Sequence, residues 1–321
     1  MPDRSRRSHS SKRTGSRTAV ALAVAAVLLA GCGGAPDSST AGSAGSTPSV
    51  SITPQAAISS TPTPAEPTSR STPPSAFDKT DWEVEAEKSA LLRNNIYSAG
   101  EVSTVRCDLP TGLLGSKAAV VRYITVMITC LDKAWRPLIV RSAYFEPVQV
   151  HTFNRKSTSP CGPGRDGVVA FYCASNHGIY LDWTAYVVES RSRLLGSQIT
   201  LINATAHEYG HHVQELAGIM PYYAARYYRT TGAARLENSR RMELQASCFA
   251  TAFFGANQQS LNLRGARLEE LRLGRGGDED YPGTPRDHGS ASSIRIWEPA
   301  GFKSSSPGSC NTWAASAKRV S

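Results

Sequence analysis

A long segment without any aromatic residue separates the beginning of this chain from the part that can fold. From Gly33 to Ser75 nearly all residues are Ser, Thr, Pro, Ala or Gly, and charge is confined to Asp37, Glu66 and Arg70. Such a segment cannot bury enough apolar surface to offset the entropy lost on ordering, so we expect it to be a tether. Roughly 245 residues follow it, which suffices for one large domain or two small ones.

The residues before this tether have the order of a secretory signal peptide. A basic stretch is followed by an apolar run from Thr18 to Ala30, with Leu29-Ala30-Gly31-Cys32 at the end. As a helix this run spans only about 20 Å, which is short of a bilayer crossing, so residues 1–31 are expected to be a signal peptide. The last four residues resemble the bacterial lipobox. The resemblance implies cleavage before Cys32 and its acylation, for example with palmitate; the alternative is ordinary secretion with cleavage nearby.

An acylated Cys32 would place the protein on the extracytoplasmic face of the cell membrane. Several acyl chains on one cysteine make membrane residence stable, because each buried methylene contributes about 0.8 kcal/mol. Residues 32–75 would then hold the folded part about 35 to 40 Å from the lipid.

The charge gives no reason to expect a nucleic-acid partner. The formal net charge is +9, but the basic residues of the leader supply more than half of it, and no basic run follows. A charge this small over the remaining length leaves no footprint for phosphate binding.

The cysteines of the folded part are even in number, which in an exported chain indicates three disulfides. They are Cys107, Cys130, Cys161, Cys173, Cys248 and Cys310. None shows the close spacing of a thiolate metal site. Their spacing does not choose among the possible connectivities.

Hydrophobic periodicity predicts an α+β fold, because short strands come first and long helices afterwards. The expected strands are 148–153, 168–173 and 178–182. The expected helices are 80–97, 116–135, 198–217, 234–254, 261–273 and 291–297. Pro137 is expected to end or bend the second of these helices.

The helix expected from residue 198 carries an H-E-x-x-H motif, His207-Glu208-Tyr209-Gly210-His211. The two histidines lie about 40° apart on one helical face, one turn above the other, so both imidazoles can reach one metal ion. Glu208 lies about 60° to the side of His211, where it can take a proton from water instead of coordinating the metal. The alternative is a helix whose two histidines merely stack.

A catalytic zinc needs a third protein ligand. The metzincin pattern requires a glycine and a histidine where this chain has Gln214 and Ala217, so that subclass is excluded. Glu243, on the helix expected over 234–254, is the favoured candidate, and His288 and Asp287 are held in reserve. Glu243 could otherwise be one more solvated carboxylate.

Several motifs together resemble the bacterial family of putative neutral zinc metallopeptidases. They are HEYGHHVQ (207–214), RMELQASCF (241–249), His288-Gly289-Ser290 and Ser309-Cys310-Asn311-Thr312, with further matches at 160–162, 171–173 and 179–182. The resemblance implies a zincin-like domain over residues 76–321, with a small sheet and an active-site helix that carries the motif. It also implies that His207, His211 and Glu243 bind Zn²⁺ and that Glu208 is the general base and acid.

The chain departs from the family at one position near this site. The family usually has an aspartate where this chain has Ser247, at i+4 from Glu243 and therefore on the same helical face. An aspartate there could orient a ligand histidine through its second ring nitrogen, whereas serine supplies no charge. Reduced activity is therefore expected, but not loss of the metal.

The resemblance also implies how the cysteines pair. Family members tend to carry the pairs Cys161–Cys173 and Cys248–Cys310, which leaves Cys107 for Cys130. The pair Cys248–Cys310 would tie the helix that carries Glu243 to the C-terminal segment.

Four further features have more than one interpretation. The strand 178–182 is expected to be an edge strand that pairs with substrate, although an interior strand is the alternative. His288 could donate a hydrogen bond to the oxyanion of the reaction, or could be a capping or surface residue. His212 is expected to support the site or to lie on the surface. The tyrosines are expected to pack on a helix rather than to form a substrate platform: Tyr222, Tyr223, Tyr227 and Tyr228.

Together these features predict a membrane-anchored, extracytoplasmic zinc metallopeptidase that hydrolyses a peptide or protein substrate. The competing prediction is a zinc-binding envelope lipoprotein with a binding or assembly role and weak or no catalysis. A hydrolase of cell-wall peptides would differ from the first only in its substrate.

Overall fold

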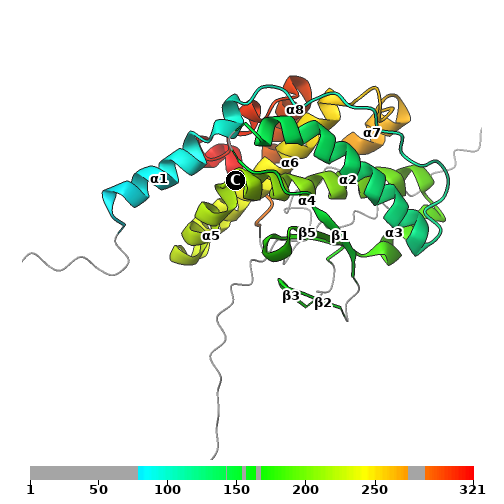
Figure 1. The fold of residues 1–321 in the computed structure, drawn as a ribbon, viewed down its shortest axis with the longest axis horizontal. Helices are drawn as coiled ribbons and strands as arrows, with labels where there is room; N and C mark the ends of the chain where they lie inside the picture. The colour runs from blue at the N-terminus through cyan, green and yellow to red at the C-terminus, as the bar shows by residue number, and fades with distance from the viewer. Residues whose placement is uncertain (1–78, 142, 154–156, 164–167, 274–285) are drawn as a thin grey trace, which may run out of the picture. The chain divides into compact units, whose positions relative to one another are not determined.

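The computed structural model describes residues 79–141, 143–153, 157–163, 168–273 and 286–321 (Figure 1). The expected signal peptide 1–31, the acylation site Cys32, the linker 32–75 and the domain boundary after residue 75 lie outside these ranges. The chain forms two compact units, and a boundary between them lies between Glu85 and Ala86. The packing described below concerns the described residues from Ala86 to Ser321.

The described chain is mainly helical with a small sheet, which confirms the α+β class. The helices are α1 (Asp81–Leu92), α2 (Lys117–Ile139), α3 (Trp183–Ser190), α4 (Leu194–Leu216), α5 (Ile219–Arg229), α6 (Gly232–Ala256), α7 (Ala266–Leu273) and α8 (Ala291–Ser304). Short 3₁₀ helices include η1 (Asn95–Ser98), η4 (Pro307–Cys310) and η5 (Ala317–Val320). Within the described ranges, none of the helices combines the length and the apolar character that a bilayer crossing requires.

The sheet has three strands in the order β1 (Gln149–Thr152), β5 (Gly178–Leu181) and β4 (Ala170–Cys173). Strand β5 pairs with β1 in parallel and with β4 in antiparallel orientation. A separate short ladder joins β2 (Thr158–Ser159) to β3 (Gly162–Pro163). The prediction that 178–182 is an edge strand is therefore wrong. All four residues of β5 are buried. Ile179 and Leu181 contact the main core, and both backbone edges of the strand are paired with neighbouring strands.

Two helices extend past a proline, and only the first of these prolines, Pro137, was expected to end or bend its helix. Helix α2 runs through Pro137 to Ile139, and α8 runs through Pro299 to Ser304. Pro137 lies in the last turn, so it removes little of the hydrogen-bond ladder, and the two buried residues that follow favour the helical path. Helix α7 begins later than expected, at Ala266, after Gly265 with a φ of 51°. Helix α3 was not predicted.

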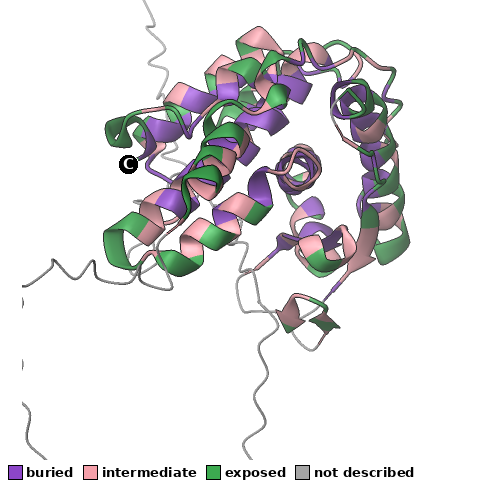
Figure 2. Cartoon of the chain, turned by 60° about the vertical axis from the view of Figure 1, so that its left-hand side comes forward, coloured by how far each residue is buried: buried purple, intermediate pink, exposed green. Residues whose placement is uncertain are grey.

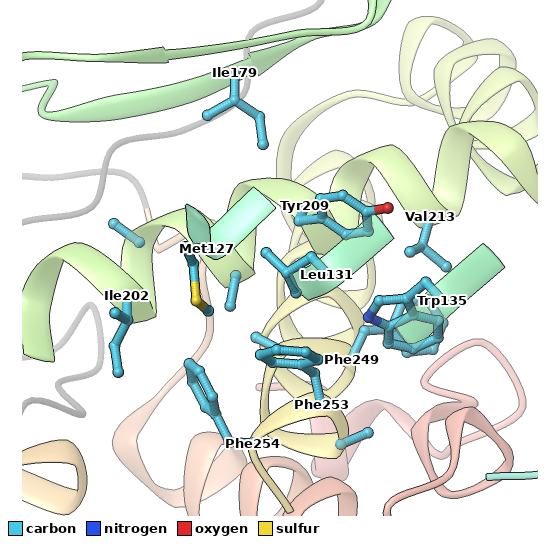
Figure 3. Close-up of a cluster of buried hydrophobic side chains, with 14 of the residues drawn as sticks. Met127, Leu131, Trp135, Ile179, Ile202, Tyr209, Val213, Phe249, Phe253 and Phe254 are labelled. Atoms are coloured by element: carbon cyan, nitrogen blue, oxygen red, sulfur yellow. The ribbon is translucent and has the colours of Figure 1, made fainter. Parts of the chain in front are cut away.

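The core lies where α2, α4 and α6 pack together (Figure 3). Trp135 of α2 contacts Phe249 of α6 with ring centroids 5.5 Å apart. Tyr209 of α4 donates a hydrogen bond to Asp132 of α2. The other labelled side chains include Met127, Leu131, Ile202, Val213, Phe253 and Phe254. Buried faces turn inward and exposed faces outward along these helices (Figure 2). Helix α4 is buried over most of its length, so the H-E-x-x-H motif lies inside the protein.

Three disulfides join the six cysteines: Cys107–Cys130, Cys161–Cys173 and Cys248–Cys310. These are the pairs that the family resemblance implied. The last of them connects α6 to η4 near the end of the chain. The C-terminal segment is therefore covalently fixed to the helix that carries Glu243.

Gly210 permits α4 and α6 to cross at short distance. A Cβ atom added at Gly210 would lie 2.6 Å from the carbonyl oxygen of Ala246 and 2.9 Å from its Cα. The neighbour is backbone, so it cannot rotate away. This contact sets the separation between the two helices that carry the candidate metal ligands.

We expect Gly210→Ala to destabilise the protein by about 1 to 3 kcal/mol, because the added methyl group forces two helices apart. The melting temperature should fall by roughly 2 to 4 °C for each kcal/mol in a domain of this size. Gly115→Ala is the matched control, since its Cβ would meet only Leu113 Cβ at 3.9 Å. Equal melting temperatures for the two variants would contradict the close-contact interpretation.

Candidate metal centre

Two histidines of α4 and one glutamate of α6 converge on a single point inside the protein. Nε2 of His207 lies 3.1 Å and Nε2 of His211 lies 3.2 Å from Oε2 of Glu243. One ligand atom from each residue lies within 4.8 Å of the others, and all three residues are buried. The structure thus groups the three residues for which the sequence predicted a common metal.

The helices explain this convergence. His207 and His211 are one turn apart on the buried face of α4, and Gly210 lets α6 approach that face. Glu243 lies in the middle of α6, where the helix is buried on most sides.

The donor set fits a zinc ion. A neutral ring nitrogen and a carboxylate oxygen about 3 Å apart repel one another unless a proton or a cation lies between them. Two imidazoles and one carboxylate form a common protein ligand set for catalytic zinc, which keeps one position for water. The alternative, in which the two histidines only stack on their helix, does not account for a buried carboxylate between both rings.

The charges of the three residues depend on one another. Burial opposes ionisation of Glu243, but His211 and His288 hold the pKa of its carboxyl well below its usual range. Burial also opposes the charged form of His211, although Glu243 raises the pKa of this imidazole above its ordinary value. Burial lowers the pKa of His207. The site therefore holds a buried carboxylate that is ready to accept a positive charge.

Glu208 is fully buried next to the group, on the same helix. No described side chain donates a hydrogen bond to either of its carboxylate oxygens, and a backbone group of Tyr172 favours the charged form. Burial raises the pKa of its carboxyl to about 7, against the lowering effect of His211. A carboxyl with this pKa can accept and return a proton near neutral pH.

His288 lies at the edge of the group, with its Nε2 atom 3.6 Å from Oε2 of Glu243. Its other ring nitrogen lies 2.7 Å from Asp287 Oδ1, an acceptor, so Nδ1 carries a proton. The ring of His288 stacks beside that of His207, with centroids 6.5 Å apart. His288 and Asp287 therefore adjoin the site, but the compact group of ligand atoms includes Glu243 instead of either.

Side chains behind the rings hold the two histidines in place. Ser247 Oγ lies 3.1 Å from Nδ1 of His207, as its helical position predicted. Gln214 Oε1 lies 2.8 Å from Nδ1 of His211, and this contact was not predicted. Its only signal in the sequence was the i+3 spacing between Gln214 and His211, which places both residues on one face.

His212 is buried, which excludes the surface position, one of the two alternatives expected for it. Its Nε2 lies 2.8 Å from the carbonyl oxygen of Glu146 and its Nδ1 lies 3.1 Å from the Tyr172 hydroxyl. Burial lowers the pKa of His212 to about 4. On α5, Tyr223 is buried and its hydroxyl contacts Ser239, while Tyr222 and Tyr227 pack against the core, in agreement with the packing interpretation. Tyr228 is exposed.

Comparison with known proteins places the chain among related sequences. Residues 111–313 match the family described as "Putative neutral zinc metallopeptidase". The "Uncharacterized protein YpfJ" of Escherichia coli is 28% identical over 209 residues, which cover 61% of this chain and 72% of the relative. The "Uncharacterized protein Rv2575" of Mycobacterium tuberculosis is 27% identical over 211 residues, which cover 58% and 68%. No solved structure matches the chain.

We expect Ser247→Asp to tighten zinc binding. A carboxylate can only accept a hydrogen bond from Nδ1 of His207, so it would leave Nε2 free for the metal and make the ring a more basic ligand. The gain should be up to roughly 10 to 100-fold in metal affinity, the scale on which such outer groups act. Ser247→Ala, which removes the hydroxyl, should bind zinc more weakly than the unchanged chain. Chelator competition measures all three affinities, and an aspartate variant no tighter than the alanine variant would refute the expectation.

Proposed function

The chain belongs to the putative neutral zinc metallopeptidase family, and we propose that it is a zinc-dependent enzyme that hydrolyses peptide bonds. The zincin-like α+β domain fits this membership. The observation that carries the proposal is the position of Glu208. A buried carboxyl whose pKa is about 7 lies beside three residues that can hold a metal.

In the proposed reaction, His207, His211 and Glu243 would hold zinc, and the chain's own residues move the proton. Bound zinc would polarise the substrate carbonyl and lower the pKa of the attacking water towards about 7. Glu208 accepts the proton of that water and returns it to the leaving amine. Because no described side chain donates a hydrogen bond to Glu208, its carboxylate is available for this exchange.

His288 is proposed to stabilise the oxyanion that develops on the substrate carbonyl. Because Asp287 holds the Nδ1 proton, the donor to the oxyanion would be the Nε2–H of the imidazolium form. The ring lies beside both His207 and Glu243. A donor close to the metal is what such a role requires.

The second candidate function is zinc-dependent binding or assembly at the cell envelope, with little catalysis. Ser247 favours it, because a neutral group stands where the family usually has a carboxylate. Glu208 favours the peptidase, because a structural zinc site has no use for a buried base with a raised pKa.

We expect Glu208→Gln to retain zinc and to lose roughly 10² to 10⁴-fold in turnover, because general-base catalysis contributes on that scale. Peptide-library cleavage and metal analysis on the full-length chain measure the two properties. Glu215→Gln on the same helix is the matched control and should keep both. Undiminished cleavage by Glu208→Gln would refute the mechanism.

The ligand assignment requires a separate test. His207→Ala, His211→Ala or Glu243→Ala should each leave two protein ligands, and zinc affinity should fall by more than the roughly 10 to 100-fold typical of outer groups. Metal analysis after dialysis measures this loss. If Glu243→Ala binds zinc as tightly as the unchanged chain, Glu243 is not the third ligand and His288 or Asp287 must be.

We also propose that the enzyme is a lipoprotein on the extracytoplasmic face of the cell membrane, with a peptide or protein substrate and no nucleic-acid partner. The lipobox-like Leu29-Ala30-Gly31-Cys32 and the tether that follows support this location.

Cys32→Ala should release the protein from membranes without a change in its circular dichroism spectrum, because the acyl chains depend on that residue alone. Cell fractionation measures the distribution between membrane and soluble fractions. A Cys32→Ala protein that remains tightly bound to membranes would exclude the lipoprotein proposal.

A further inference from the structure

We propose that Gln214 is a positioning residue that fixes the tautomer and the orientation of His211 through a hydrogen-bond chain with one permitted direction. The inference rests on the proposed metal site, but it concerns zinc affinity and proton positions and does not depend on peptide hydrolysis.

This series of hydrogen bonds runs from backbone carbonyl groups to the candidate metal ligand His211. The Gln214 side chain is fully buried, and its Nε2 donates to the Met242 carbonyl at 2.8 Å and to Gln245 Oε1 at 3.0 Å. Gln245 Nε2 in turn donates to the Cys310 carbonyl at 3.1 Å and to the Tyr97 hydroxyl at 2.8 Å.

The backbone carbonyls determine the direction of every hydrogen bond in this chain. The carbonyl oxygens of Met242 and Cys310 can only accept, so the amide nitrogens of both glutamines must face them. Oε1 of Gln214 is thereby turned towards Nδ1 of His211, 2.8 Å away. Because this oxygen also can only accept, Nδ1 of His211 carries a proton, and in the neutral ring Nε2 keeps its lone pair. Nε2 is the atom that faces Glu243.

The other histidine lacks this control. Nδ1 of His207 faces Ser247 Oγ, and a hydroxyl group can donate or accept. The hydrogen bond to Ser247 therefore permits either tautomer of His207. The site consists of one histidine whose proton position is fixed and one whose proton position is free, so Gln214 carries more of the preorganisation than Ser247.

Gln214 also links both sides of the site. It belongs to the helix that carries the histidines, and it binds the carbonyl of Met242, the residue immediately before Glu243. Loss of its amide would release the His211 ring and the backbone beside Glu243 together.

The test compares zinc affinities of full-length variants by chelator competition. Gln214→Met removes both hydrogen-bonding groups at similar volume and should weaken zinc binding roughly 10 to 100-fold. Gln198→Met is the matched control on the same helix. Gln198 is also buried and donates to a backbone carbonyl, that of Gly112 at 2.9 Å, but far from the ligands in sequence. Its zinc affinity should stay within about 3-fold of the unchanged chain.

Gln214→Glu provides the conservative rescue. A carboxylate still accepts the Nδ1 proton of His211, so this variant should bind zinc at least roughly tenfold more tightly than Gln214→Met. A purely structural role for Gln214 predicts no such recovery, since the carboxylate cannot donate to Met242 or Gln245.

Nitrogen-15 NMR of histidine-labelled, metal-free protein provides a second readout, taken at a pH high enough to deprotonate His211, whose pKa Glu243 raises. The chain has 7 histidines, so its ring nitrogens can be assigned individually. We expect the Nδ1–H tautomer for His211 in the unchanged chain and in Gln198→Met, and a mixture in Gln214→Met.

An Nε2–H tautomer for His211 in the unchanged chain would overturn the proposal, as would zinc affinity in Gln214→Met equal to that of Gln198→Met. Neither measurement involves a substrate. If the chain proves inactive as a peptidase while both results hold, only the proposed function fails.

Discussion

The candidate site depends on the close crossing of α4 and α6. The metal ligands come from two helices, and the distance between the helix backbones determines whether Glu243 reaches the imidazoles of His207 and His211. Gly210 permits this approach, since any larger residue would meet the backbone of Ala246. The same short distance allows Gln214 to bind the carbonyl of Met242 and Ser247 to reach His207. One glycine in the middle of the motif thus makes possible the contacts that surround it.

The C-terminal segment holds α6 in this position. The disulfide Cys248–Cys310 joins the helix to η4, and the Arg241 guanidinium donates to the carbonyls of Thr312 and Ala315. The Thr312 hydroxyl donates in return to the carbonyl of Arg241 at 2.6 Å. Helix α8 adds a close contact, because a Cβ at Gly301 would clash with the Cys248 carbonyl. Residues more than fifty positions away along the chain therefore support the helix that carries Glu243.

The site concentrates polar groups in an otherwise apolar interior. Buried carboxyls and imidazoles are costly unless they are paired or bind a metal. Glu243 is paired with His207 and His211, and their outer ring nitrogens face Ser247 and Gln214. Glu208 is the exception, since burial raises the pKa of its carboxyl and no described side chain donates a hydrogen bond to it. A buried carboxyl without a partner side chain reduces the stability of the fold. Its presence beside the candidate metal ligands therefore indicates a catalytic role for Glu208.

The sequence by itself determined the features that depend on local spacing. The i, i+4 positions of His207 and His211, the long amphipathic helices and the α+β class all follow from periodicity, and Glu243 followed from its place on a second helix. Tertiary structure decided the features that depend on distant partners. Strand β5 is central because β1 and β4 approach it from both sides, and α2 passes Pro137 because the next residues are buried. The direction of the Gln214 amide is set by carbonyls on α6 and η4. No local pattern encodes these contacts, because each requires backbone atoms that folding alone brings together.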